Sequence, residues 1–243
     1  MKTTGNTIFI SGGSAGIGLA IAKKLNAAGN KIIINGRNEE RLQKALVQLK
    51  DAVAIPGDLS VEADRVRIAE ELKTNHADVN IIINNAGAAF GYLLSETTNA
   101  HEKAMIEMNT NYFAIIHFTE LMLPYLLEKK ESAVVNISSI AVYGSHKFLP
   151  TYGATKAALH SYTTALRQTF EEKKNLQIYE VYPPLVNTEF SAEIGGAAGI
   201  QPSEVADELF IGLETNLFDI PVGEAKIYAQ AIGEAMSKLS HQA

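Results

Sequence analysis

A tyrosine and a lysine four residues apart, Tyr152 and Lys156, form the pair in the sequence best suited to proton chemistry. On a helix this spacing places both side chains on one face. A phenol has a pKa of about 10, which is too high for efficient acid–base catalysis near neutrality, and a nearby ammonium lowers it by stabilising the phenolate. The pair could therefore exchange a proton with a substrate oxygen, although a Tyr-x-x-x-Lys pair on its own is common by chance.

Further polar residues stand where predicted strands end. Ser139 follows one predicted strand and lies thirteen residues before Tyr152. The segment Asn84–Gly87 closes another predicted strand, and Asn111 lies in a predicted helix. Parallel strands bring their carboxyl ends to one ligand crevice, so we expect these residues to meet there, with the Ser139 hydroxyl bonding a substrate oxygen. Ser138 is a weaker candidate, because alternation along the strand points it elsewhere.

The segment Ser11–Gly18 lies between a predicted strand and a predicted helix, and its glycines follow the pattern Gly-x-x-x-Gly-x-Gly. Glycines permit a tight turn and close approach to a pyrophosphate, which the free N–H groups of the helix N-terminus then bind. The same glycines could serve only the turn. The pattern predicts cofactor contacts from Gly12, Ser14, Gly16, Ile17 and Gly18.

The end of the second predicted strand bears on cofactor choice. Dinucleotide-binding proteins that prefer NAD usually carry an acid here that bonds the ribose 2′-OH, whereas this chain has Gly36 followed by Arg37. An arginine can hold a 2′-phosphate in a bidentate manner, so we expect NADP(H) to be preferred. The alternative is a surface Arg37 that pairs with Glu39 or Glu40.

Short β-branched runs alternate with longer helical stretches, a pattern typical of a parallel sheet with helices on both faces. The predicted strands are residues 7–11, 31–35, 52–56, 80–84, 133–138 and 177–182, with a weaker candidate at 225–228. The predicted helices are residues 16–28, 38–49, 61–74, two within 100–130, and 151–174. These elements predict an α/β fold, a single Rossmann-type doubly wound domain over residues 1–243 with about seven parallel strands.

One stretch is unusually rich in small residues. It includes Gly195–Gly199 and follows the last strong strand. Loops at this edge of such a sheet carry ligand contacts, so residues 189–202 could form a mobile lid over the substrate. A plain surface connection is the alternative.

The motifs jointly resemble the short-chain dehydrogenase/reductase family, from Thr7 to about Thr188. The match in order and spacing is highly specific. It rests on the glycine loop and on Asp58, Asn84–Gly87, Asn111, Ser139, Tyr152 and Lys156.

The resemblance implies a role for each matching residue. Tyr152 would be the general acid–base, and Lys156 would lower its pKa and bind the nicotinamide ribose. Ser139 would orient and polarise the carbonyl, and Asn111 would hold a water that joins Lys156 to solvent. The remaining cofactor contacts implied are Asp58 and Leu59 at the adenine, Asn85, Ala86 and Gly87 along the cofactor, Pro183 after the sixth strand, and Thr188 at the carboxamide.

The sequence departs from the family pattern after the sixth strand. Pro183-Pro184 replaces the usual Pro-Gly, which stiffens the turn and puts its cofactor contacts in doubt. The usual C-terminal strand and Gly-Gly ending are replaced by residues 219–225. That ending, together with Gly13–Gly18 and Ala154–Ser161, is similar to a bacterial subgroup that includes an oxidoreductase-like protein encoded with lipoteichoic-acid D-alanylation genes. The physiological substrate does not follow from this resemblance.

The composition excludes several other classes of site. The chain has no cysteine, and its six histidines show no metal-ligand spacing, so we expect no disulfide and no metal site. A formal net charge of −6 without a long basic run disfavours nucleic acid and anionic membranes as partners. The apolar run near the N-terminus is too short for a signal peptide, and we expect no stretch long and apolar enough to span a membrane. A cytoplasmic protein is expected.

These observations favour an NADP(H)-dependent carbonyl reductase or alcohol dehydrogenase acting on a small molecule. A nucleotide-sensing regulator without turnover is one alternative, and a dehydratase or epimerase on the same fold is another. The resemblance also suggests a homodimer or homotetramer, formed through the helices around residues 100–130 and 151–174.

Overall fold

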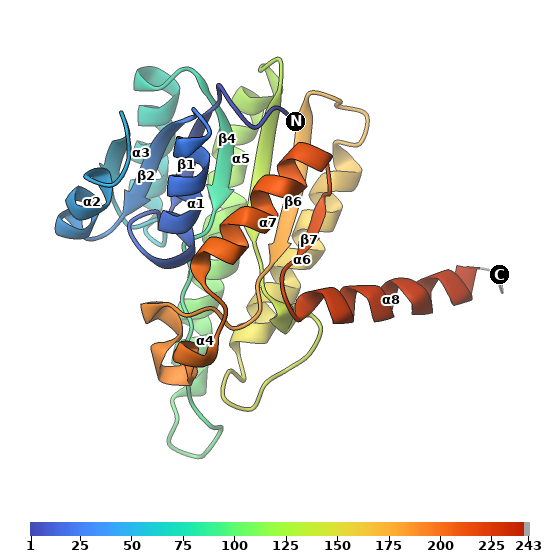
Figure 1. Ribbon diagram of the computed structural model, residues 1–243. Helices are drawn as coiled ribbons and strands as arrows, with labels where there is room; N and C mark the ends of the chain where they lie inside the picture. Colours follow the sequence, from blue (N-terminus) through green and yellow to red (C-terminus); the bar gives the residue numbers. More distant parts are fainter. Residues whose placement is uncertain (241–243) are drawn as a thin grey trace.

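The computed structural model describes residues 1–240 and contains one seven-stranded parallel sheet (Figure 1). The strand order is β3-β2-β1-β4-β5-β6-β7. The strands are β1 (Thr7–Ser11), β2 (Lys31–Gly36), β3 (Val53–Pro56), β4 (Val79–Asn84), β5 (Ser132–Ile137), β6 (Leu176–Tyr182) and β7 (Asp219–Pro221). The order reverses between β1 and β4, and a crevice for a ligand is expected at that point, outside the carboxyl ends of the strands. The predicted α/β fold is confirmed.

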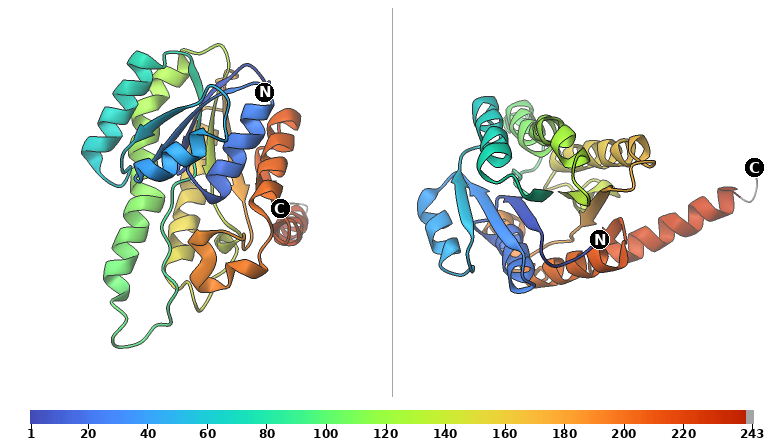
Figure 2. Two further views of the ribbon diagram at one scale, coloured as in Figure 1. Left: turned by 60° about the vertical axis from the view of Figure 1, so that its left-hand side comes forward. Right: turned by 90° about the horizontal axis from the view of Figure 1, so that it is seen from above.

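Helices cover both faces of the sheet (Figure 2). They are α1 (Gly16–Ala27), α2 (Glu39–Leu46), α3 (Glu62–Asn75), α4 (Ala100–Met108), α5 (Ala114–Leu127), α6 (Tyr152–Thr169), α7 (Pro202–Thr215) and α8 (Ala225–Ser240). One face packs against α1, α2 and α7, and the other against α3, α5 and α6. Helix α8 points away from the rest of the chain (Figure 1).

The strands are apolar on both sides because both sides are covered. In β2, Ile32 and Ile34 pack towards α1 and α2, whereas Ile33 packs towards the α3 side. In β1, Ile8 and Phe9 divide between the faces in the same way. A run of consecutive isoleucines therefore supplies both cores from a single strand.

The C-terminal part differs from the prediction. The weak strand candidate at residues 225–228 is wrong, because α8 begins at Ala225 and continues through an alanine-rich sequence that favours a helix. The seventh strand, β7, lies instead within residues 219–225, the segment expected to replace the usual C-terminal strand. It is only three residues long and pairs with β6 at an edge of the sheet, where Pro221 is tolerated because its missing N–H faces no neighbouring strand.

Helix α7 was not predicted, although its start carries two local signals. Pro202 occupies the first turn, and Gln201 and Glu204 form a capping box. Both features favour the beginning of a helix. The helix packs against α1 and so completes the cover over that face of the sheet.

Candidate active site

Tyr152 is the first residue of α6 and is buried, so its phenol stands at the end of the sheet where β5 finishes. Ser139 follows β5, and its hydroxyl accepts a hydrogen bond from the Ala141 N–H at 3.1 Å, which begins a short 3₁₀ helix, Ile140–Val142. Burial raises the pKa of Tyr152, a hydrogen bond with Ser139 opposes this, and the charge of Glu107 raises it further. The phenol is therefore protonated at neutral pH, as a proton donor must be.

Lys156 lies one turn further along α6 and is also buried. Its ammonium donates to the Ile137 carbonyl at 2.8 Å and lies 5.6 Å from the centre of the Tyr152 ring. Burial lowers the pKa of Lys156 to about 8, and the charge of Glu180 works in the opposite direction. Desolvation is the largest effect on the Tyr152 pKa, and the expected lowering of that pKa by Lys156 stays a prediction.

Asn111 is fully buried in a π-helical turn, Asn109–Phe113, which joins α4 to α5. Its amide oxygen accepts from the Ala88 N–H at 2.8 Å, and its amide nitrogen donates to the Ala88 carbonyl at 2.8 Å and to the Thr155 hydroxyl at 3.0 Å. A single π-turn inside a helix commonly marks a functional position. Asn111 thereby ties the loop after β4 to the helix that carries Tyr152, and its predicted water contact stays a prediction.

The loop after β4 also holds the glycine loop in place. The Asn85 amide donates to the carbonyls of Ser11 and Gly12 at 2.9 and 3.2 Å. The Ser11 hydroxyl accepts from the N–H groups of Asn85 and Ala86 at 2.9 and 3.0 Å. Asn85 and Ala86 therefore position the glycine loop.

Gly12 and Gly18 in the glycine loop are closely packed against neighbouring groups. A Cβ at Gly18 would lie 2.3 Å from the Gly12 carbonyl oxygen, and one at Gly12 would lie 3.0 Å from the Asn85 amide nitrogen. Gly12 also has a φ of +64°, which favours glycine. The loop is thus a close-packed backbone turn that ends at the N-terminus of α1, a cradle suited to the pyrophosphate of a dinucleotide.

Gly16 opens α1 beside the loop that follows β6. A Cβ on Gly16 would lie 3.1 Å from the Thr188 methyl group. The Pro183 carbonyl accepts from the Ile140 N–H at 2.9 Å, which ties the proline turn to the segment after Ser139. Thr188 and Pro183 therefore flank the crevice from the β6 side, and their cofactor contacts stay predictions.

The ends of β2 and β3 form a more open corner. The Arg37 side chain is 78% exposed, and its guanidinium lies 3.7 Å from the Asp58 carboxylate. Arg37 thus pairs with Asp58. The alternative interpretation of the sequence had named Glu39 or Glu40 as its partner, and that partner is wrong. Ser14 is adjacent, since a Cβ on Gly36 would lie 3.2 Å from its hydroxyl. Leu59, also predicted to meet the adenine, is buried in the core on the α3 side.

A second arginine at this corner was missed. Arg41 pairs with Glu189 at 2.8 Å, across to the segment after β6. Arg41 and Glu189 line a cavity of about 280 Å³ together with Ser14. Arg41 lies in the first turn of α2, close in sequence to Arg37, and this proximity was the signal that could have identified it.

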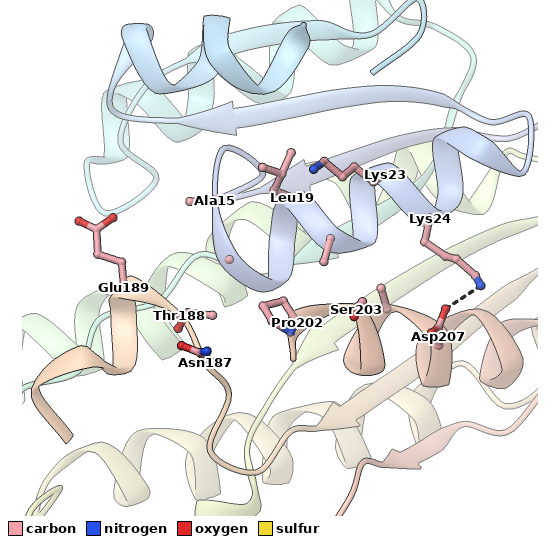
Figure 3. Close-up of a pocket in the computed structure, with 13 residues that line it drawn as sticks. Ala15, Leu19, Lys23, Lys24, Asn187, Thr188, Glu189, Pro202, Ser203 and Asp207 are labelled. Atoms are coloured by element: carbon pink, nitrogen blue, oxygen red, sulfur yellow. Dashed lines mark ion pairs between the residues drawn. The ribbon is translucent and has the colours of Figure 1, made fainter. Parts of the chain in front are cut away.

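A larger cavity of about 710 Å³ lies between the start of α1, residues 187–189 and the first turn of α7 (Figure 3). Ala15, Leu19, Thr188 and Pro202 line it. The close-up shows these side chains around a space that opens beside the glycine loop. The cavity therefore continues the crevice along the outer side of α1.

The glycine-rich segment after β6 forms two 3₁₀ helices, Glu189–Ile194 and Gly196–Ala198. The Phe190 ring lies 6.4 Å from the Tyr152 ring, centre to centre. Phe190 thus brings this segment close to Tyr152, and its role as a lid stays a prediction.

Sequence reasoning also missed Glu107, a fully buried acid on α4. One carboxylate oxygen accepts from the Phe90 N–H at 2.9 Å, and the other accepts from the Thr151 hydroxyl at 2.6 Å. The Thr151 hydroxyl also lies 2.8 Å from that of Tyr92. Glu107 joins the loop after β4 to the residue immediately before Tyr152, and nothing in its sequence surroundings distinguishes it from a solvated glutamate.

Among the described residues, the structure holds no cluster of acidic residues or histidines that could bind a metal ion. No helix within residues 1–240 is both long and apolar enough to span a membrane.

Residues 6–198 match the model of the short chain dehydrogenase family. The uncharacterized oxidoreductase DltE of Bacillus subtilis is 32% identical to the chain, in an alignment that covers 87% of this chain and 83% of DltE. A short chain dehydrogenase from Burkholderia cenocepacia in complex with NADP superposes with a TM-score of 0.85 at 23% identity, covering 100% of this chain and 98% of its own. A short chain dehydrogenase/reductase from Burkholderia phymatum in complex with NAD superposes with a TM-score of 0.86 at 19% identity, covering 99% of this chain and 96% of its own.

The chain belongs to the short-chain dehydrogenase/reductase family of oxidoreductases. Within the family it is similar to the DltE-like proteins, as the resemblance in the sequence indicated. One of the two structural neighbours was solved with NADP and the other with NAD, so the fold alone leaves the choice of cofactor open.

Proposed function

We propose that the protein is an NADP(H)-dependent oxidoreductase that moves hydride between the nicotinamide and a carbonyl or alcohol carbon. The observation that carries the proposal is the buried group formed by Tyr152, Ser139 and Lys156 at the strand ends beside the glycine loop. A sensor without turnover needs no proton donor, whereas a dehydratase or epimerase would use the same phenol and is distinguished by the net change in the cofactor.

The residues divide the chemistry among them. The cofactor supplies the hydride when it is bound. Ser139 orients the substrate oxygen, and Tyr152 donates its proton to that oxygen as the carbon is reduced. Lys156 holds the nicotinamide ribose and supplies a positive charge beside the phenol, which favours the phenolate that forms. The reverse direction uses the same groups with the proton moving to Tyr152.

The cradle at Gly12–Gly18 would hold the pyrophosphate at the N-terminus of α1. Gly36 leaves no carboxylate on β2 to bond a ribose diol, and the exposed Arg37 side chain would turn from Asp58 to a 2′-phosphate. The Asp58 carboxylate competes for the same guanidinium, so the preference for NADP(H) over NAD(H) is expected to be moderate.

Residues 1–243 would form a single domain, with residues 189–202 as the lid above Tyr152. A homodimer or homotetramer through the helices around residues 100–130 and 151–174 agrees with three exposed apolar side chains in that region, Met105, Ile106 and Phe113. The substrate would be a small carbonyl or alcohol, and the protein would act in the cytoplasm without nucleic acid or membrane partners.

The test is NADPH oxidation against a panel of aldehydes and ketones, followed at the absorbance of the reduced nicotinamide. We expect carbonyl-dependent oxidation by the wild type. Conversion of substrate without net change in the cofactor would indicate a dehydratase or epimerase. Tight binding of NADPH without turnover of any compound would indicate a sensor.

A further inference from the structure

Two fully buried polar residues, Glu107 and Asn111, lie about one helical turn apart where α4 continues into its π-helical turn. Each of them makes one contact with the loop after β4 and one with α6. Asn111 binds the backbone of Ala88 in that loop and the hydroxyl of Thr155 on α6. Glu107 makes the corresponding pair of contacts one turn earlier, closer to the residue that carries the phenol.

The carboxylate of Glu107 fixes the direction of a short chain of hydrogen bonds. It accepts from the Phe90 N–H at 2.9 Å and from the Thr151 hydroxyl at 2.6 Å. An ionised carboxylate only accepts, so the single hydroxyl proton of Thr151 is directed to Glu107. The Tyr92 hydroxyl, 2.8 Å from that of Thr151, must then be the donor between the two. Glu107 thus orders the loop at Phe90 and Tyr92 through one charged group.

The loop held by Glu107 also borders the segment after β6. A Cβ on Gly91 would lie 2.9 Å from a methyl carbon of Ile194, and one on Gly87 would lie 3.9 Å from the Phe190 ring. The Phe190 ring in turn lies 6.4 Å from that of Tyr152, centre to centre. A shift of this loop would therefore change the surroundings of the phenol from two sides.

Burial of Glu107 is costly, because a charged carboxylate loses its hydration in the interior. Well-packed apolar side chains often stabilise a protein at least as well as buried charged groups. Hydrogen bonds to a charge, however, are roughly twice as strong as those between neutral groups and hold their partners more firmly. The acid therefore supplies a fixed geometry that packing alone would not give.

We propose that Glu107 is a positioning residue for the reaction. It fixes the loop Ala88–Tyr92 and the first turn of α6 against each other, and so holds the Tyr152 phenol where its proton can pass to the substrate oxygen. The inference rests on the proposed function, which makes Tyr152 the proton donor. A displacement of about 1 Å can cost ~10²-fold in rate. Because the contacts of Asn111 remain, the loss expected without Glu107 is smaller, about tenfold.

Two substitutions break the contact in different ways and keep the charge. Thr151→Val removes the hydroxyl that binds Glu107, and Glu107→Asp withdraws the carboxylate by one methylene so that it cannot reach both partners. Each should lower kcat about tenfold and leave NADPH affinity unchanged, at a temperature where every variant is folded. Thr151→Ser restores the hydroxyl and should restore the wild-type kcat.

The matched control is Thr169→Val, further along the same helix. The Thr169 hydroxyl donates to the Ala165 carbonyl at 2.8 Å and is exposed. The substitution therefore removes a hydroxyl from α6 without touching the loop after β4. Its kcat and NADPH affinity should equal those of the wild type.

The positions can be measured without turnover. In a crystal structure of Glu107→Asp, the Tyr152 hydroxyl should shift by more than about 0.5 Å relative to Ser139 Oγ, since productive sites are held within roughly that tolerance. Amide hydrogen exchange should become about tenfold faster at Phe90, which loses a hydrogen bond to a charge. The Ala88 amide has a separate partner and should stay as slow as in the wild type.

Wild-type kcat in folded Thr151→Val and Glu107→Asp, or a Tyr152 hydroxyl that does not move, would show that Glu107 serves stability alone and would overturn the proposal. A loss of kcat that Thr151→Ser does not restore would overturn it as well. Failure of the proposed function looks different. In that case the wild type would turn over no carbonyl, or Tyr152→Phe would match it, while the crystal structure and the amide exchange would still decide whether Glu107 positions the phenol and the loop.

Discussion

The catalytic corner at β5 and α6 and the ribose corner at β2 and β3 are built in contrasting ways. Tyr152 and Lys156 are 8% and 4% exposed, whereas the Arg37 side chain is 78% exposed. Electrostatic interactions are strong in a water-poor interior and are screened at the surface. Changes at the catalytic corner should therefore have large effects, and changes at the ribose corner should mainly adjust affinity.

The largest effect is expected for Tyr152→Phe. The substitution removes the proton donor and leaves the ring and its packing in place. Activity should fall by roughly 100-fold or more, the usual minimum for a general acid, with NADPH binding nearly intact. Steady-state kinetics and a cofactor titration measure the two quantities. Near-normal turnover would remove Tyr152 from the mechanism and with it the contrast between the corners.

The next largest effect is the pH dependence of the unfolding free energy that buried Lys156 causes. Its pKa is about 8 in the folded protein, whereas the ordinary value is 10.5. Between pH 8 and pH 10.5 the unfolded chain therefore binds more protons than the folded protein, and the free energy of unfolding rises with pH. Relative to Lys156→Met, the wild type should gain up to about 3 kcal/mol between pH 8 and 10.5. Denaturant unfolding at both pH values gives the difference. A constant gap between the two proteins would contradict the burial of a charged Lys156.

Glu107→Gln should have a smaller effect, which changes both the free energy of unfolding and the pKa of the Tyr152 phenol. The amide keeps the shape but cannot accept from both Phe90 and Thr151 as a carboxylate does, so a loss of about 1–3 kcal/mol in unfolding free energy is expected. Removing the charge should also lower the pKa of Tyr152 and move the alkaline limb of the reductase pH profile downwards.

Thr151→Val is the matched control for Glu107→Gln, because it breaks the same hydrogen bond and keeps the charge. It should destabilise the protein without moving the alkaline limb. An identical shift in both variants would mean that Glu107 acts on Tyr152 through position alone.

The smallest effect is expected at the ribose corner. A hydrogen bond to a charged group contributes about 1.5–3 kcal/mol, and exposure of Arg37 favours the lower end, so Arg37→Ala should weaken NADPH binding by about tenfold. NADH binding should hardly change, and Gly36→Asp should move the preference towards NADH. Titrations with both cofactors provide the measurement. A larger loss in Arg41→Ala than in Arg37→Ala would reassign the 2′-phosphate to Arg41.

Residues with a fixed spacing could be predicted from the sequence, and isolated buried acids could not. The four-residue interval between Tyr152 and Lys156 and the strand end at Ser139 place the catalytic corner, because helix and strand periodicities extend over many residues. Glu107 and Glu180 have the local surroundings of ordinary helix and strand residues. Their burial arises from chain segments far away in sequence, such as the loop at Phe90 for Glu107.

The errors near the C-terminus have a related cause. β7 has three residues, too few to show the alternation of a strand, and it is a strand only because it pairs with β6. The Ile227-Tyr228 dipeptide has the composition of a strand, but the alanines that follow favour a helix. Short elements depend on tertiary contacts more than on their own propensity.

The two outer strands of the sheet also limit how copies of the chain could associate. β3 and β7 are four and three residues long, and each ends in a proline, Pro56 and Pro221. A short rim strand that lacks one N–H donor is a poor template for a strand from another molecule. The sheet is therefore protected against growth into edge-to-edge aggregates, and contacts between copies are left to the helices and loops.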